Sequence, residues 1–172
     1  MNAPTAESVR RPAGPRARSA EADRPGVLAP PPLLYAPALV LGLLLEWEVP
    51  LPAMPGAMSW PLGAVVVLAG VALGAWFFVS FRRARTPVDV RRSTTTVVTD
   101  GPFRFTRNPG YLSLTVTYLG IAVLADAIWP LVLLPVVVFV VQRTVIEREE
   151  RYLERKFGDD YLRYKRRTRR WV

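Results

Sequence analysis

Four apolar stretches separated by polar segments dominate the pattern of the chain, and they cover residues 27–45, 61–81, 111–125 and 129–146. About 20 apolar residues form a helix roughly 30 Å long, which matches the hydrocarbon thickness of a bilayer. The last two stretches are separated only by Asp126-Ala127-Ile128, a turn short enough for a helical hairpin. The pattern therefore predicts an all-α, polytopic membrane protein with about four transmembrane helices.

Basic residues mark one side of this arrangement. All 23 Lys and Arg residues fall before the first stretch, between the second and third, or from Arg143, near the end of the fourth, onward. Cytoplasmic loops collect Lys and Arg, so four spans with both termini in the cytosol are predicted. The bias toward Arg, Ala, Val and Pro suggests a bacterial source, and the predicted location is the inner membrane.

The ends of the chain differ from the apolar part. Residues 1–26 are rich in Pro, Arg and Ala without an apolar run, which predicts a disordered basic extension outside the fold. Residues 27–172 are predicted to form one membrane domain, in which 147–172 is a cytosolic helical segment able to fold back as a cover. The absence of Cys and His excludes thiolate nucleophiles and Cys or His metal sites. Neither a metal nor a nucleic-acid partner is predicted.

The second apolar stretch contains Gly70 and Gly74 four residues apart. Small residues one helical turn apart let two helix backbones approach closely in lipid. We predict that they pack against a helix, either of this chain or of another copy.

The segment before the third stretch is a candidate anion site. Asp100-Gly101-Pro102 predicts a turn, and Asn108-Pro109 predicts a helix start, with Asn108 as the N-cap and Pro109 at the first helical position. The positive end of this helix, with Arg104 and Arg107 beside it, would hold a carboxylate or phosphate. The alternative is that both arginines only contact lipid head groups.

The segment after the fourth stretch is a candidate cation site. Ile146, Glu150, Leu153 and Phe157 recur at helical spacing, which places Glu150 in an apolar stripe. A carboxylate there is costly unless a cation or strong donor meets it. Alternatively, Glu149 and Glu150 belong to an ordinary solvated helix face. Because both segments flank one hairpin on one side, a zwitterion such as the methionyl moiety of S-adenosylmethionine would satisfy both.

Two motifs in this order resemble a known group of membrane enzymes. Residues 99–112 read TDGPFRFTRNPGYL, and Glu149-Glu150 is followed by Leu153, Phe157-Gly158, Tyr161 and Tyr164. This pattern resembles the isoprenylcysteine carboxyl methyltransferase and phospholipid N-methyltransferase group. The resemblance implies an integral-membrane enzyme that binds S-adenosylmethionine near the cytosolic ends of the last two spans. The segment 147–172 would cover this cofactor, and a lipophilic small-molecule or lipid substrate would enter from the bilayer.

The resemblance also implies the residues of the cofactor site. They are Gly101, Pro102, Arg107, Asn108, Pro109, Tyr111, Glu149, Glu150, Tyr161 and Tyr164. Arg107, Asn108 and Glu150 are the predicted catalytic residues.

Each of these residues has a predicted role. Arg107 and the helix start at Asn108 would bind the carboxylate of the cofactor or of the acceptor. Glu149 and Glu150 would hold the ammonium group or ribose hydroxyls of the cofactor, and the two tyrosines would close over its adenosine.

One departure from the group's pattern bears on the acceptor. The group's motif often reads Arg-His-Pro, whereas this chain has Arg107-Asn108-Pro109. A carboxylate acceptor is ionised at neutral pH and needs no base, whereas an amine must lose a proton, for which Glu150 is the best available acceptor. The lack of His therefore favours carboxyl O-methylation.

Three alternatives stay open at the level of sequence. They are a phospholipid-type N-methyltransferase, an NADPH-dependent membrane reductase similar to the steroid 5-alpha-reductase group, and a non-enzymatic membrane scaffold. The identity of the acceptor and the oligomeric state are not predicted.

Overall fold

The computed structural model describes residues 30–51, 56–84 and 97–172. In chain order the helices are α2 (Pro32–Glu48), α3 (Gly56–Arg83), the 3-10 turn η1 (Gly101–Arg104), α4 (Pro109–Leu124), α5 (Ile128–Val141), the π-helical turn η2 (Gln142–Ile146), α6 (Glu147–Phe157) and α7 (Asp159–Arg167). The described residues contain no strand, only one isolated bridge between Thr106 and Arg169, so the all-α prediction is confirmed. The predicted disordered extension, 1–26, lies outside the described residues.

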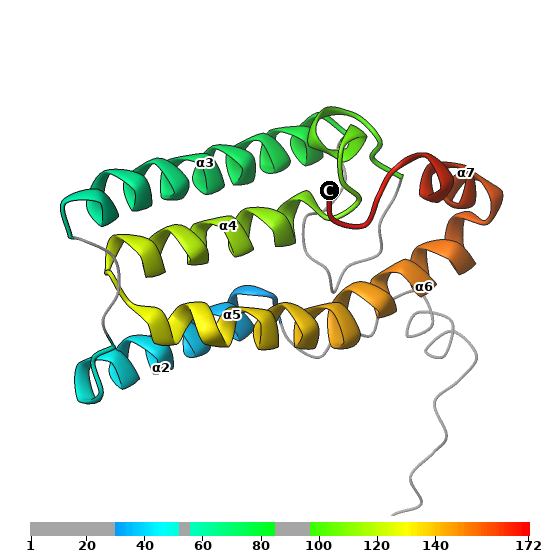
Figure 1. The fold of residues 1–172 in the computed structure, drawn as a ribbon. Helices are drawn as coiled ribbons and strands as arrows, with labels where there is room; N and C mark the ends of the chain where they lie inside the picture. The colour runs from blue at the N-terminus through cyan, green and yellow to red at the C-terminus, as the bar shows by residue number, and fades with distance from the viewer. Residues whose placement is uncertain (1–29, 52–55, 85–96) are drawn as a thin grey trace, which may run out of the picture.

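The helices follow the apolar stretches. The predicted helical segment after the fourth stretch continues it directly, because α5, η2 and α6 form one continuous helix from Ile128 to Phe157 (Figure 1). This helix and Met58–Arg83 are the two helices of the described chain that are long and apolar enough to cross a membrane. Helix α4 is a shorter apolar helix, and the four-span arrangement stays a prediction.

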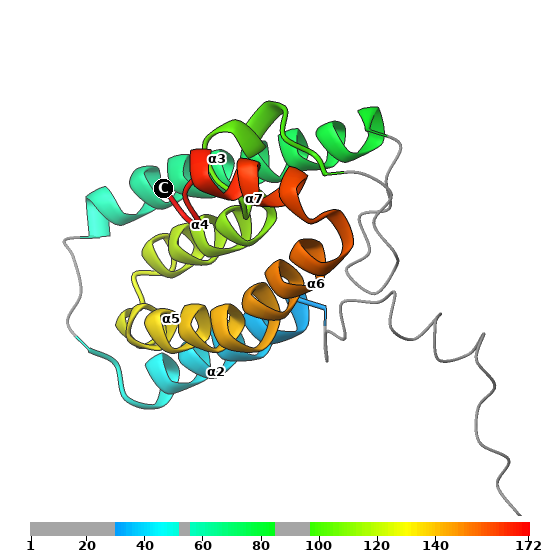
Figure 2. The same cartoon turned by 90° about the vertical axis from the view of Figure 1, so that its right-hand side faces the viewer.

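The helices pack in two tight pairs that the hairpin joins. Helix α3 lies along α4, α2 lies along α5, and α4 and α5 meet through the turn at residues 125–127 (Figures 1 and 2). Between them lies a core of buried aromatic and aliphatic side chains, which are Tyr35, Tyr111, Tyr118, Val137, Val141, Val145 and Ile146. The α4–α5 hairpin is therefore the centre of the fold.

Gly70 shows why α3 needs small residues. A Cβ atom at Gly70 would lie 2.4 Å from the Thr117 Oγ1 atom and 2.7 Å from the Thr117 backbone nitrogen. At Gly74 the nearest atom, the Ser113 Oγ, would be 3.3 Å away. The predicted packing role of this glycine pair is confirmed, and the partner is α4 of the same chain.

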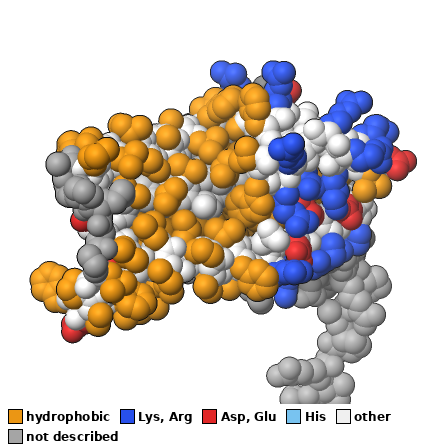
Figure 3. Space-filling view, viewed as in Figure 1, with side chains coloured by type: hydrophobic (Ala, Val, Ile, Leu, Met, Phe, Trp, Pro, Cys, Tyr) orange, Lys and Arg blue, Asp and Glu red, His pale blue; other side chains and the backbone are white. Residues whose placement is uncertain are grey.

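The outer surface of the helices is apolar. Val65, Leu68 and Phe139 are more than half exposed, and only 11% of the most apolar window of Met58–Arg83 is buried. A core helix of a soluble protein would be mostly buried, so this surface is suited to lipid. In Figure 3 the Lys and Arg side chains gather at the end formed by α6, α7 and the end of α3.

At the opposite end of the helices, the carboxylate of Glu46 joins α2 to the start of α5. The Glu46 Oε2 atom, at the end of α2, accepts hydrogen bonds from the backbone N–H groups of Ile128 (2.7 Å) and Trp129 (3.1 Å). Glu46 Oε1 accepts another from the Leu51 N–H at 2.8 Å. Unpaired N–H groups at a helix start attract anions, so Glu46 caps α5 and fixes α2 against the hairpin.

Candidate functional site

A cavity of about 320 Å³ lies at the charged end of the helices. The end of α3, the first part of α6, the start of α4 and α7 form it, together with the start of α2, η1 and the segments on either side of η1. Its lining residues are Pro30, Pro31, Pro32, Phe77, Phe78, Phe81, Val97, Val98, Phe103, Arg107, Asn108, Pro109, Gly110, Tyr111, Ser113, Leu114, Glu149, Glu150, Leu153, Tyr161 and Tyr164. Its volume is at the lower end of the range of small-molecule sites.

One wall of the cavity is aromatic. The ring centroids of Phe77 and Phe81 are 4.8 Å apart, and the Phe103 ring lies 5.9 Å from Phe77 and 5.5 Å from Phe81. Phe77 and Phe81 sit one turn apart near the end of α3, while Phe103 belongs to η1. The faces of such rings attract cations, so this wall is compatible with a positively charged ligand.

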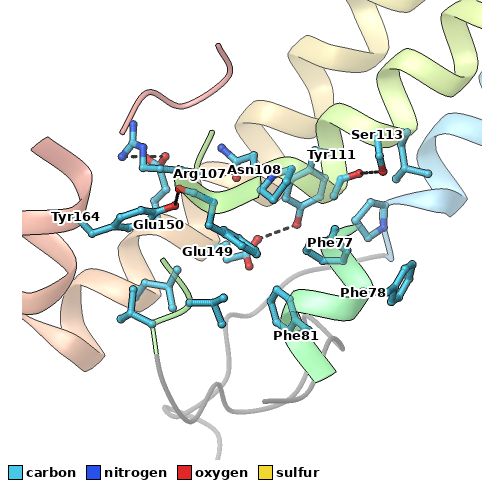
Figure 4. A pocket seen from close by; sticks show the side chains of 18 of the residues that line it. Phe77, Phe78, Phe81, Arg107, Asn108, Tyr111, Ser113, Glu149, Glu150 and Tyr164 are labelled. Carbon is cyan, nitrogen blue, oxygen red and sulfur yellow. Dashed lines mark hydrogen bonds and ion pairs between the residues drawn. The ribbon is translucent and has the colours of Figure 1, made fainter. Parts of the chain in front are cut away.

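The opposite side of the cavity is polar, and Figure 4 shows Arg107, Glu149 and Glu150 there. The Arg107 side chain is only 9% exposed. Its Nη1 atom lies 3.4 Å from the Glu150 Oε1 atom, yet neither Nε nor Nη1 of Arg107 has a hydrogen-bond partner among the described residues. Buried N–H donors are nearly always satisfied, so these two donors make Arg107 a candidate contact for a ligand acceptor.

Glu150 is 5% exposed and faces several cations. Its Oε1 atom accepts a hydrogen bond from Arg170 Nε at 3.0 Å, and its Oε2 atom accepts one from Arg170 Nη2 at 2.7 Å. Lys165 Nζ lies 3.9 Å from Oε2. The carboxylate raises the pKa of Arg170 further, chiefly through these hydrogen bonds. The prediction that a cation must meet Glu150 is confirmed, and the alternative of a solvated helix face is wrong for this residue.

Glu149 has a different environment. Its Oε2 atom accepts a hydrogen bond of 2.8 Å from the Tyr111 hydroxyl, and no ion pair of Glu149 with a described residue is found. Glu149 lines the same cavity as Arg107. The cavity thus brings a carboxylate with one protein hydrogen-bond donor together with a guanidinium that has unused donors.

The segment that carries Arg107 is held by the end of the chain. The Arg170 carbonyl accepts hydrogen bonds from the Thr106 hydroxyl (3.0 Å) and from Asn108 Nδ2 (2.8 Å). The Arg107 N–H donates to the Arg169 carbonyl at 2.9 Å. Pro109 begins α4 as predicted, but Asn108 makes no side-chain capping bond, because its amide group binds the Arg170 carbonyl instead.

Two tyrosines of α7 close the cavity. Tyr161 is buried, and the Tyr164 hydroxyl donates to the Phe103 carbonyl at 2.8 Å. Burial raises the pKa of both hydroxyls well above the usual range, although the positive charge of Arg107 acts in the opposite direction. Both groups therefore stay neutral hydrogen-bond donors at physiological pH.

Most of the predicted site residues come together in this cavity. Arg107, Asn108, Pro109, Tyr111, Glu149, Glu150, Tyr161 and Tyr164 all line it, whereas Gly101 and Pro102 do not. A Cβ atom at Gly101 would lie 2.4 Å from the Ser80 Oγ atom, and its φ of +64° favours glycine, so Gly101 serves the close approach of η1 to α3. Pro102 is buried in the same turn.

The two arginines of the predicted anion site also differ in whether they line the cavity. Arg104 is exposed and is absent from the cavity lining, so it does not share the predicted anion site. For Arg107 the alternative of contact with lipid head groups alone is wrong, because the side chain is buried.

Sequence reasoning missed two parts of the site. The first is the aromatic wall, for which the i,i+4 spacing of Phe77 and Phe81 at the end of an apolar helix was an available signal. The second is Arg170, which no sequence signal separates from the neighbouring arginines.

Comparison with known proteins gives two matches. The model of the family described as phospholipid methyltransferase matches residues 58–160. An uncharacterized protein of Haemophilus influenzae is 45% identical over 67 residues, which cover 36% of this chain and 98% of the relative. No solved structure matches significantly.

Proposed function

The chain belongs to the phospholipid methyltransferase family, and we propose that it transfers the methyl group of S-adenosylmethionine to a lipophilic acceptor from the bilayer. The observation that carries this proposal is the pairing of opposite requirements in one cavity. Arg107 has buried donors without hydrogen-bond partners among the described residues, and Glu149 offers a carboxylate to a cation. The amino-acid part of the cofactor, which has one carboxylate and one ammonium group, would satisfy both.

The proposed roles follow from the partners of each residue. Arg107 binds the carboxylate of the cofactor, and Glu149 accepts a hydrogen bond from its ammonium group. Glu150 is engaged by Arg170 and lies beside Arg107, so its proposed role is to arrange these two cations. Asn108 holds the Arg107 segment through the Arg170 carbonyl. Tyr161 and Tyr164 cover the adenosine.

Positioning and exclusion of water are the contributions of the chain to the reaction. S-adenosylmethionine supplies, when bound, a methyl group activated by a sulfonium centre. The rings of Phe77, Phe81 and Phe103 exclude water and present their faces to positive charge. Methyl transfer from sulfonium is an in-line displacement, for which alignment of the two reactants lowers the barrier most.

For the acceptor, carboxyl O-methylation is proposed, because a carboxylate needs no base and the chain has no His. N-methylation is the second candidate, because Glu149 in the cavity provides a proton acceptor for an amine. The family assignment favours methyl transfer over the reductase and scaffold interpretations.

The apolar outer surface supports a membrane protein. The proposed arrangement has four spans, with the basic end, the cavity and both termini on the cytosolic side of a bacterial inner membrane. On this arrangement the acceptor approaches from the inner leaflet.

The proposal is tested by methyl transfer itself. Purified full-length protein and native lipid extract are incubated with methyl-labelled S-adenosylmethionine, and labelled products are identified by mass spectrometry. Mild alkali then separates the two acceptor classes, since a methyl ester releases its label as methanol and a methylated amine keeps it.

Matched variants decide whether the cavity is responsible. Arg107→Gln should abolish labelling, whereas Arg166→Gln, which removes an equal charge from an exposed position of α7, should leave it intact. Labelling that persists in Arg107→Gln would contradict the proposed site.

A further inference from the structure

Two arginines lie beside one buried carboxylate, and they are not equivalent. Arg170 contacts both oxygens of Glu150, with an Nε–Oε1 distance of 3.0 Å and an Nη2–Oε2 distance of 2.7 Å. Arg107 reaches only Oε1, at 3.4 Å from Nη1, without a hydrogen bond. A two-point guanidinium contact is the strongest arrangement for a carboxylate, so Glu150 is committed to Arg170.

Because Glu150 is bound by Arg170, the Arg107 guanidinium can still donate hydrogen bonds to a ligand. Its Nε and Nη1 donors are buried and have no hydrogen-bond partner among the described residues, and Arg107 lines the cavity. If Glu150 turned to Arg107 instead, these donors would be occupied inside the protein. A ligand carboxylate would then have to compete with Glu150 for the guanidinium.

The backbone fixes which arginine takes the carboxylate. The Arg170 carbonyl accepts bonds from Thr106 and Asn108, the residues on either side of Arg107, and the Arg107 N–H binds the Arg169 carbonyl. These hydrogen bonds therefore fix the position of the Arg107 segment relative to the Arg170 segment.

We propose that Arg170 is a positioning residue of the cofactor site, which neutralises Glu150 and so reserves the Arg107 guanidinium for the carboxylate of the cofactor. This inference rests on the proposed function. It implies that loss of the Arg170 side chain weakens only ligands that carry this carboxylate, because Glu150 then captures Arg107.

The test uses two ligands that differ in one group. Binding of S-adenosylmethionine and of decarboxylated S-adenosylmethionine to the full-length protein in detergent is measured by calorimetry. The wild type should prefer S-adenosylmethionine by roughly tenfold or more, as expected for a charge-assisted hydrogen bond. In Arg170→Gln this preference should shrink to about twofold, while the affinity for the decarboxylated ligand stays the same.

A second substitution provides the rescue. In the double variant Arg170→Gln with Glu150→Gln, no carboxylate is left to capture Arg107, so the preference should return. Arg166→Gln, an exposed charge of the same segment, should keep the wild-type preference. Arg170→Lys, which offers one contact instead of two, should lie between wild type and Arg170→Gln, and it maintains the test if Arg170→Gln does not fold.

The outcomes separate the two claims. An unchanged preference in Arg170→Gln, or equal weakening of both ligands, would overturn the positioning role while leaving the proposed function standing. A wild-type protein that binds neither ligand would overturn the proposed function itself, and the inference with it.

Discussion

Arg170 and Glu150 are joined at both ends of the carboxylate, although 20 residues separate them in the chain. This contact holds the residues after α7 against α6, while Tyr161 and Tyr164 of α7 itself line the cavity. The position of the end of the chain therefore depends on a charged pair of which one partner, Glu150, is almost fully buried.

Glu149 is expected to be essential for binding of the cofactor. Replacing Glu149 by Gln removes the negative charge from a carboxylate that has one protein donor, Tyr111. We expect S-adenosylmethionine affinity to fall by about tenfold to a hundredfold, which calorimetry in detergent can measure. Glu154→Gln is the control, since Glu154 lies on the same helix, pairs with Lys165 and does not line the cavity. Equal affinity of the two variants would count against the proposed role.

Asn108 is expected to hold the end of the chain. In Asn108→Ala the Arg170 carbonyl loses one of its two side-chain donors, which should loosen the segment by about 1 kcal/mol. Hydrogen exchange should accelerate at residues 168–172 and stay unchanged in α3. Thr144→Val, which removes only a local bond to the Val140 carbonyl, should leave both regions as they are. Unchanged hydrogen exchange at residues 168–172 in Asn108→Ala would show that the Asn108 bond to the Arg170 carbonyl does not hold the end of the chain.

Gly70 is expected to tolerate a methyl group much less than Gly74. The new Cβ atom of Gly70→Ala would meet the backbone of Thr117, which cannot move without shifting α4, whereas that of Gly74→Ala meets the Ser113 side chain at 3.3 Å. Overpacking of this kind costs about 1–3 kcal/mol. Thermal unfolding in detergent should therefore show a lower midpoint for Gly70→Ala than for Gly74→Ala. The reverse order would mean that α3 and α4 pack differently.

Alkaline pH is expected to destabilise the fold through α7. Burial raises the pKa of the Tyr161 and Tyr164 hydroxyls, so above pH 10 the unfolded chain releases protons that the folded chain keeps. Stability should accordingly be unaffected by these groups below about pH 9 and should fall as the pH rises above about 10. The double variant Tyr161→Phe with Tyr164→Phe should show a smaller fall in the unfolding midpoint over this range. An equally steep fall would assign the effect to other tyrosines.

The apolar pattern predicted the helices well, since lipid-facing helices must be apolar over their whole length. Residues 147–157 are good helix formers, so the change of polarity at Glu147 marks a change of surroundings rather than a helix end, and α6 continues to Phe157. In the same way, the pattern showed that Glu150 needs a cation but not which one. Arg170 stands among several arginines, and only the fold of the tail distinguishes it.

The motif residues were predicted better than the walls around them. The run Arg107-Asn108-Pro109 could be recognised in the sequence as a motif of the site, and all three residues line the cavity. Phe77 and Phe81 looked like ordinary lipid-facing residues. In the sequence, an aromatic side chain that lines a cavity cannot be distinguished from one that faces lipid. Gly101 shows the converse case, a motif residue that leaves room for the Ser80 and Trp76 side chains of α3 against η1.

The unbroken helix from Ile128 to Phe157 has a mechanical consequence. At about 1.5 Å per residue it is a rod of roughly 45 Å, with side chains for lipid along one part and both cavity carboxylates near the other end. Helices adjust their tilt to the thickness of the surrounding hydrocarbon. On the proposed membrane arrangement, such tilting would change the distance between these carboxylates and the Arg107 guanidinium just before α4, so turnover in reconstituted vesicles should vary with acyl-chain length.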